Sequence, residues 1–155
     1  MKTAIAILAV GVVSFGMIGN AVAKGYHLIP EGTTFSGTGS TSATKSGVTL
    51  KCKAKFQGHV DANGVGSVDS GSFTGELGCT SVGLSNLPWA ATAKSAKKAQ
   101  LANVAFTSPI GNCGPGNLTV TITEGVIKFK NQPLAGSCTI SGSIKTSPAV
   151  SIVPN

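Results

Sequence analysis

The chain contains no arginine and few acidic residues. All 12 basic side chains are lysines, set against five acids, and the formal net charge is +7. Proteins that read base edges and phosphates rely on the planar fork of arginine, and single-strand binders place stacking aromatics between their basic residues. The lysines of this chain have no such aromatics among them. We therefore predict that the protein has no specific nucleic-acid partner.

The shortage of acids also limits the chemistry that the chain can perform. General acid–base catalysis needs paired groups, and no carboxylate pair can be named among the five acids. None of the many serines lies in a G-x-S-x-G motif. We predict a non-enzymatic protein with no catalytic residues and no cofactor. The alternative is a hydrolase whose Ser-His-Asp group assembles in space around His27 or His59.

A glycine-rich stretch, "GNCGPG" at 111–116, resembles a dinucleotide-binding fingerprint only by its letters. It lacks the strand–turn–helix setting that such a site requires, and Pro115 interrupts it. We interpret it as a turn around a disulfide cysteine.

The four cysteines have no C-x-x-C spacing, and neither histidine lies near a cysteine pair in a metal-ligand pattern. We therefore expect no metal site. An even number of cysteines in an exported protein predicts two disulfides, for which three connectivities exist. We favour Cys52–Cys79 and Cys113–Cys138, because this sequential pairing gives two intervals of similar length.

The N-terminus has the three parts of a secretory signal peptide. A positive start at Lys2 precedes an apolar run to Ile18, and the small-x-small sequence Ala21-Val22-Ala23 follows. We predict a cleaved signal peptide over 1–23; the alternative is an N-terminal membrane anchor. No later apolar run is long enough to span a bilayer. The expected product, 24–155, is one domain secreted to the cell surface or medium, and not an integral membrane protein.

Two stretches of the mature chain alternate with the period of a β-strand. In "TLKCKAKFQG", 49–58, apolar residues point one way and Lys51, Lys53 and Lys55 point the other. In "LTVTITEGVIKFKN", 118–131, a two-residue turn at Glu124-Gly125 pairs Ile122 with Ile127. We therefore predict a half-buried strand and a hairpin.

Abundant glycine, serine and threonine favour further short strands. The stretch 90–102 is interpreted as strand, basic loop, strand, and 36–47 as a loose polar loop or edge. Together these patterns predict an all-β protein with a single β-sandwich or jelly-roll-like domain and two disulfides. The remaining predicted strands are 58–61, 65–69, 72–77, 89–93, 101–107, 138–145 and 149–153.

The lysine rows are first of all solvated strand faces, and lysine protects strand edges from aggregation. They are also candidates for contact with anionic polymers. Trp89 is a candidate for contact with an oil–water interface, with a place in the core as its alternative. The candidate surface-contact residues are Lys51, Lys53, Lys55, Lys97, Lys98 and Trp89.

Short motifs along the whole mature chain resemble the bacterial family of alkane oxidation activators, the PraA/PraB-like proteins. The most specific is "NQPLAGSC" with "NCGPG" upstream. The resemblance implies an exported protein that promotes growth on long-chain alkanes and is linked to biofilm and adhesion. It implies no catalytic residues. The motifs that carry it are "IPEGTTF", "CKAKFQGHV", "LPWAATA", "NVAF", "NCGPG", "NQPLAGSC" and "SPAVSIV".

Two functions follow as hypotheses. The first is an accessory protein that acts at the oil–water interface or the cell surface. The second is a self-associating matrix or fimbria-like subunit, an adhesin with no direct role in alkane use. Exposed apolar side chains would favour the first, and strand edges open to pairing would favour the second.

Overall fold

A computed structural model describes residues 25–155, so the expected signal peptide at 1–23 lies outside the described residues. Strands make up most of this part of the chain, joined by tight turns. In order they are β1 (Tyr26–Ile29), β2 (Thr33–Lys45), β3 (Val48–Val60), β4 (Gly66–Gly75), the 3-10 turn η1 (Cys79–Ser81), β5 (Gly83–Ser85), β6 (Trp89–Ala93), β7 (Lys98–Thr107), β8 (Cys113–Thr123), β9 (Val126–Leu134), β10 (Cys138–Ser147) and β11 (Ser151–Pro154). Within the same residues there is no helix that could cross a membrane.

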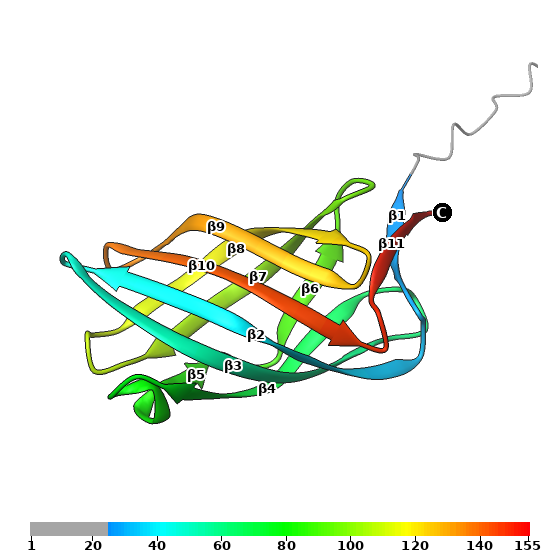
Figure 1. The fold of residues 1–155 in the computed structure, drawn as a ribbon. Helices are drawn as coiled ribbons and strands as arrows, with labels where there is room; N and C mark the ends of the chain where they lie inside the picture. Colours follow the sequence, from blue (N-terminus) through cyan, green and yellow to red (C-terminus); the bar gives the residue numbers. More distant parts are fainter. Residues whose placement is uncertain (1–24) are drawn as a thin grey trace, which may run out of the picture.

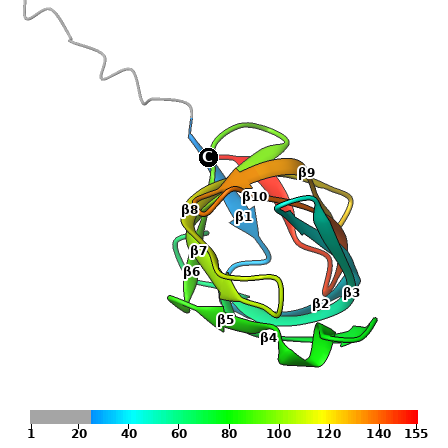
Figure 2. The same ribbon diagram turned by 90° about the vertical axis from the view of Figure 1, so that its left-hand side faces the viewer.

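The main sheet closes on itself as a β-barrel (Figures 1 and 2). Its strands follow the order β7-β6-β4-β3-β2-β10-β9-β8, and pairing of β8 with β7 completes the circle. The short β5 pairs with the second half of β7. The all-β prediction is confirmed, but the sandwich or jelly-roll architecture is wrong. Strands in both architectures have one buried and one wet face, so the alternation could not show that β7 and β8 would meet.

The predicted loop at 36–47 is also wrong, because these residues form most of β2. This strand pairs along its full length with β3, and from Ser36 onward with β10. Its glycines and serines suggested a loop, yet a strand between two partners satisfies its backbone through their hydrogen bonds. Threonine and alanine supply most of the remaining positions, and Phe35 supplies a large inward side chain.

The predicted hairpin is confirmed as β8 and β9. Ile122 pairs with Ile127, and Thr121 with Lys128. Glu124 and Gly125 have φ of 50° and 76°, the left-handed conformation that a tight hairpin turn of this kind requires at both central positions. The predicted register therefore holds, and it keeps Lys128 on the wet face.

The lysine-rich stretch is β3, and its predicted alternation is confirmed. Leu50, Cys52 and Ala54 are buried between exposed lysines. Two of the predicted strands, 65–69 and 72–77, are one strand, β4, which carries a β-bulge opposite Gln57 and Gly58. The strand–loop–strand reading of 90–102 is confirmed by β6 and β7.

The two ends of the barrel differ. One end, the capped end, is covered by the antiparallel pair β1–β11, which buries Leu28, Val60 and Val150 to 2% exposure or less. The other, the disulfide end, carries both disulfides, Cys52–Cys79 and Cys113–Cys138, as predicted. In Figure 1 the capped end lies at the right, and Figure 2 looks at the disulfide end.

Candidate functional site

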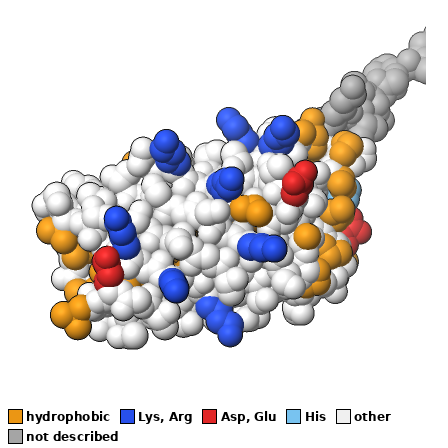
Figure 3. Space-filling model, viewed as in Figure 1, with side chains coloured by type: hydrophobic (Ala, Val, Ile, Leu, Met, Phe, Trp, Pro, Cys, Tyr) orange, Lys and Arg blue, Asp and Glu red, His pale blue; other side chains and the backbone are white. Residues whose placement is uncertain are grey.

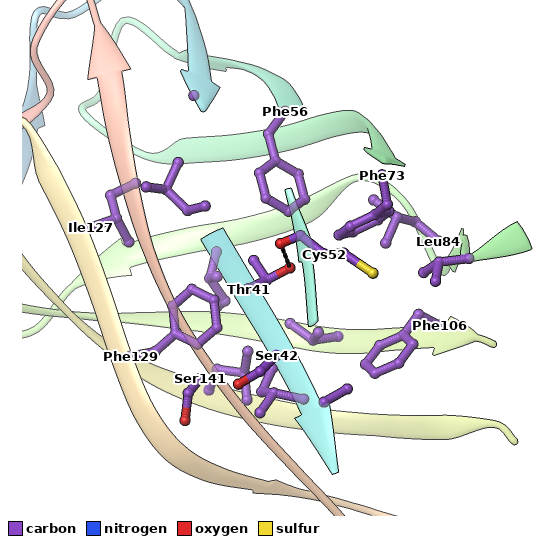
Figure 4. A pocket seen from close by; sticks show the side chains of 18 of the residues that line it. Thr41, Ser42, Cys52, Phe56, Phe73, Leu84, Phe106, Ile127, Phe129 and Ser141 are labelled. Atoms are coloured by element: carbon purple, nitrogen blue, oxygen red, sulfur yellow. Dashed lines mark hydrogen bonds between the residues drawn. The ribbon is translucent and has the colours of Figure 1, made fainter. Parts of the chain in front are cut away.

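The barrel encloses an apolar cavity of about 110 Å³. It extends along the barrel from the half near the capped end, where Phe35 and Ile127 line it, to the disulfide end, where Leu50 and Cys52 do. Figure 4 shows side chains from several strands around it. Most of its wall is aromatic or aliphatic. The residues that line it are Phe35, Gly37, Thr41, Ser42, Ala43, Leu50, Cys52, Phe56, Phe73, Val82, Leu84, Trp89, Leu101, Val104, Phe106, Leu118, Ile127, Phe129, Ile140, Ser141 and Ile144.

Two aromatic rings of the cavity wall lie directly over glycines of the neighbouring strands. A Cβ added at Gly71 would lie 2.7 Å from Cδ1 of Phe56, and one at Gly142 would overlap Cζ of Phe129. A larger residue at either position would push its ring into the cavity. Phe56 also packs edge-on against Phe73, with ring centroids 5.7 Å apart. The strand glycines therefore make room for rings, as close approach in a sheet requires.

The open volume arises beside β2, because its inward residues are small. Gly37, Thr41 and Ala43 line the cavity where larger side chains would fill it. The hydroxyl of Thr41 donates to the carbonyl of Cys52 at 3.2 Å, so its polar atom is already bonded. No buried side-chain nitrogen or oxygen of residues 25–155 lacks a partner. A water molecule would find few polar groups here, and such a cavity favours an apolar occupant.

The disulfide end is tied together by more than its two disulfides. The Lys45 ammonium donates to the carbonyls of Asn112 and Gly136, each at 2.8 Å, and so joins two loops. Two large apolar side chains are nevertheless exposed at this end. Leu77 is fully exposed and Val48 is 52% exposed. We call these two exposed side chains the rim of the disulfide end.

Trp89 lies inside the barrel and not on its surface. It is 5% exposed, its ring lines the cavity, and its Nε1 donates to the carbonyl of Ser85 at 2.8 Å. A ring that is hydrogen-bonded and buried in this way cannot touch an outside surface without unfolding. The expected surface contact is wrong for Trp89, and the core alternative is right.

The predicted lysines are exposed, and the sheet brings some of them together. Cross-strand register aligns Lys53 with Lys128 through two intervening serines, and Lys55 with Lys145 through Thr38. These four residues, the lysine face, lie on the outside of β3, β10 and β9, and β2 runs between β3 and β10. Figure 3 shows blue side chains spread over this side of the molecule.

The other predicted lysines lie at the edges of this face or away from it. Lys51 is on the same strand, nearer the disulfide end, and its backbone N–H donates to Glu76. Lys97 and Lys98 lie at the β6–β7 turn, away from the lysine face. The Lys97 carbonyl there accepts a hydrogen bond from the backbone N–H of Ile122 in β8. The structure therefore separates the two predicted groups of lysines.

His59 takes part in a surface cluster of three side chains. Its Nδ1 lies 2.6 Å from Asp69 Oδ2, and Ser67 Oγ donates to Asp69 Oδ1 at 2.6 Å. Partial burial raises the pKa of Asp69, but the hydrogen bonds from Ser67 and His59 and the charge of His59 outweigh it and hold this pKa below its ordinary value. The serine bonds to the carboxylate and not to the imidazole, so this cluster does not have the arrangement of a Ser-His-Asp triad.

His27, the other histidine, joins the two ends of the described chain. Its Nε2 lies 2.8 Å from Glu31, and its Nδ1 lies 2.6 Å from Asn155. Among residues 25–155 no group of three or more histidine, cysteine or acidic side chains could hold a metal ion.

Comparison of the sequence with models of protein families shows to which family the chain belongs. The model of the PraA/PraB-like alkane oxidation protein activators matches residues 1–154. The chain belongs to this family. No match was found among curated proteins or among solved structures. The resemblance expected from the short motifs is thereby confirmed.

In this PraA/PraB-like protein, sequence reasoning missed the cavity. The signal was present in β2, where glycine, threonine and alanine occupy inward positions between strands rich in larger side chains. That signal is readable only once β2 is known to be a strand and its partners are known. The description of the family as an activator names no ligand, so the cavity has to be interpreted from its own chemistry.

Proposed function

We propose that the chain is an exported, non-enzymatic accessory protein that promotes use of long-chain alkanes and attachment of the cells that make it. The observation that carries this proposal is the match to the alkane oxidation activator family over residues 1–154. Two disulfides support export, because such bonds persist in oxidising compartments. The proposed cleavage after Ala23 would release a single domain from Lys24 onward.

The lysine face supports a role in attachment. Adjacent strands lie about 4.8 Å apart, so Lys55 and Lys145, two strands apart, are roughly 10 Å from each other across hydroxyl side chains. A row of ammonium groups at this spacing attracts an anionic polymer without specifying its sequence. We assign surface polysaccharide or another anionic matrix polymer as the partner of this face, with Lys51 at its edge.

A variant set tests this face. Replacing Lys53, Lys55, Lys128 and Lys145 by glutamine should abolish salt-sensitive binding to an anionic polysaccharide such as alginate, because exposed charges act over about 8–10 Å at physiological ionic strength. The matched comparison removes two charges in each variant: Lys55→Gln with Lys145→Gln on the lysine face, and Lys97→Gln with Lys98→Gln away from it. Equal loss in both variants would show that only net charge matters and would contradict the assignment.

Deletion and add-back test the function as a whole. A deletion strain should grow poorly on hexadecane, and purified oxidised protein, residues 24–155, should restore growth when added to the medium. Normal growth and normal attachment of the deletion strain would contradict the proposal. Mass spectrometry of the exported protein should find Lys24 as its first residue; an uncleaved N-terminus would favour an anchor.

A matrix or fimbria-like subunit is the second candidate. The observation that favours it is the β1–β11 pair, in which each strand keeps one edge without a strand partner among residues 25–155. Such edges are templates for pairing with another chain. Size-exclusion chromatography with light scattering separates the two candidates: the accessory protein should elute as a monomer, and the subunit as high-mass species that resist detergent.

A further inference from the structure

The cavity has no role in attachment to an anionic polymer, because its wall is apolar and lies inside the barrel. Eight-stranded barrels have an interior just wide enough to be filled by side chains or to hold one small ligand. Here the side chains do not fill it. From the geometry we infer that the barrel interior is a binding site for one saturated, unbranched alkyl chain. This inference rests on the proposed function and names the ligand class of its site.

The size of the cavity supports this ligand. An apolar cavity of about 150 Å³ inside another protein stays dry and binds benzene. The 110 Å³ found here is somewhat smaller, which suits a short length of a narrow chain better than a branched or fused-ring molecule. Only part of a long chain would fit, and the remainder would extend toward the rim.

The composition of the wall supports it as well. Several lining side chains, among them Phe35, Phe73, Leu84 and Leu101, are only partly buried although they point inward. Contact with an alkyl chain would remove this apolar surface from water, which is the main driving force for such binding. The wall offers no charged side chain, so the site recognises the hydrocarbon itself.

The route of entry follows from the difference between the two ends. The capped end is closed by β1 and β11, which lie across it. The disulfide end has the exposed Leu77 just before η1 and the exposed Val48 at the start of β3, and the Cys52–Cys79 bond fastens η1 to β3. A chain entering here would meet apolar side chains before reaching the cavity.

Calorimetric titration of the oxidised protein with 1-alkanols from butanol to dodecanol tests the inference. Each methylene that enters the cavity should tighten the dissociation constant about fourfold, and the gain should stop once the cavity is full. No binding at any length would overturn the inference. A gain that continues through dodecanol and is the same in cavity-filled variants would show adsorption to the outside and would also overturn it.

The variants are Ala43→Phe, which places a ring in the cavity, and Ala90→Phe as its control on the exposed face of β6. Ala43→Phe should weaken binding of decanol by tenfold or more, and Ala90→Phe should leave it unchanged. If Ala43→Phe does not fold, Val82→Phe fills the same cavity from the segment before β5. Decanol binding unchanged in a folded cavity-filled variant would overturn the inference.

Competition distinguishes the two sources of an alkyl chain. Decane and decanoate should both displace decanol. Equal displacement indicates a free hydrocarbon, and stronger displacement by decanoate indicates the acyl chain of a lipid. Displacement by neither would overturn the inference.

The cavity inference and the proposed function can fail separately. If the deletion strain grows normally on hexadecane, the proposed function fails. If it grows poorly and Ala43→Phe restores growth as well as the wild type does, the function stands and the cavity is not the site that serves it. Restoration by Ala90→Phe and not by Ala43→Phe is the expected result.

Discussion

The two ends of the barrel are built from the same strands, yet they are finished in opposite ways. At the capped end, β1 and β11 lie across the opening and bury Leu28, Val60 and Val150. At the disulfide end, covalent bonds and the Lys45 ammonium hold the strands together, and aromatic side chains surround open space. The first end is closed by packing alone, whereas the second adds two buried disulfides and a lysine to its packing. Covalent links and packing can therefore close the two ends of one barrel while small inward residues of β2 leave open space between them.

Removal of a disulfide should give the largest effect. Cys113→Ser with Cys138→Ser, or Cys52→Ser with Cys79→Ser, should each lower the free energy of unfolding by about 3–4 kcal/mol, because loops of this length are freed in the unfolded chain. Urea denaturation of each variant measures the loss. Hydrogen exchange should speed up first at the disulfide end. Faster exchange at β1 and β11 instead would contradict the division between the ends.

Truncation of a leucine at each end sharpens the comparison. Leu28→Ala should cost about 2–5 kcal/mol, since it opens a void in a filled region. Leu84→Ala should cost less, because this side chain is only partly buried and already borders the cavity. Thermal and urea unfolding of the two variants, measured side by side, check the order. Equal losses would mean that the cavity end is as tightly packed as the capped end.

Addition of methyl groups should have opposite signs at the two ends. Ala43→Val fills part of the cavity with a β-branched residue that suits a strand, and should stabilise the protein by up to about 1 kcal/mol. Val150→Leu overpacks the capped end and should cost about 1–3 kcal/mol. Differential scanning calorimetry should show a raised Tm for the first variant and a lowered Tm for the second. A lowered Tm in both would argue against open space beside β2.

The smallest effect is expected on the surface, near the capped end. Because the pKa of Asp69 is lowered in the folded protein, its carboxylate stabilises the fold above its unfolded pKa of about 3.9, and this contribution is lost as the pH falls through the folded pKa. Asp69→Asn should cost less than about 1 kcal/mol at pH 7, since the pair is exposed. Denaturation at pH 7 and at pH 2 should show the difference closing in acid. If the wild type remains more stable than Asp69→Asn at pH 2, the loss of stability comes from altered packing and not from the charge of the carboxylate.

Local patterns in the sequence predicted local structure well. The β8–β9 hairpin and the wet face of β3 follow from alternation and turn chemistry within about ten residues, so they needed no knowledge of distant partners. The disulfide pairing was also found, although only as the favoured one of three. These features depend on neighbours in the chain or on spacing.

The errors involve long-range pairing. β2 looked like a loop because its glycines and serines are weak strand formers by themselves. It forms a strand because β3 and β10 pair with it on either side. Closure of the barrel depends on β7 meeting β8, which no local pattern records. Trp89 could be placed inside or outside until the barrel surrounded it. The cavity, which depends on all three of these features, was therefore out of reach.

The most direct test of the central claim is a methyl-resolved NMR titration of the oxidised protein with dissolved xenon. Xenon enters dry apolar cavities and needs no polar contact. The methyl signals of Leu84, Leu101, Ile127 and Ile144 should shift, while those of Leu28, Val60 and Val150 should stay in place. Shifts confined to Leu77 and Val48 on the rim, or equally large at Leu28, Val60 and Val150, would contradict the claim that the barrel encloses an apolar cavity.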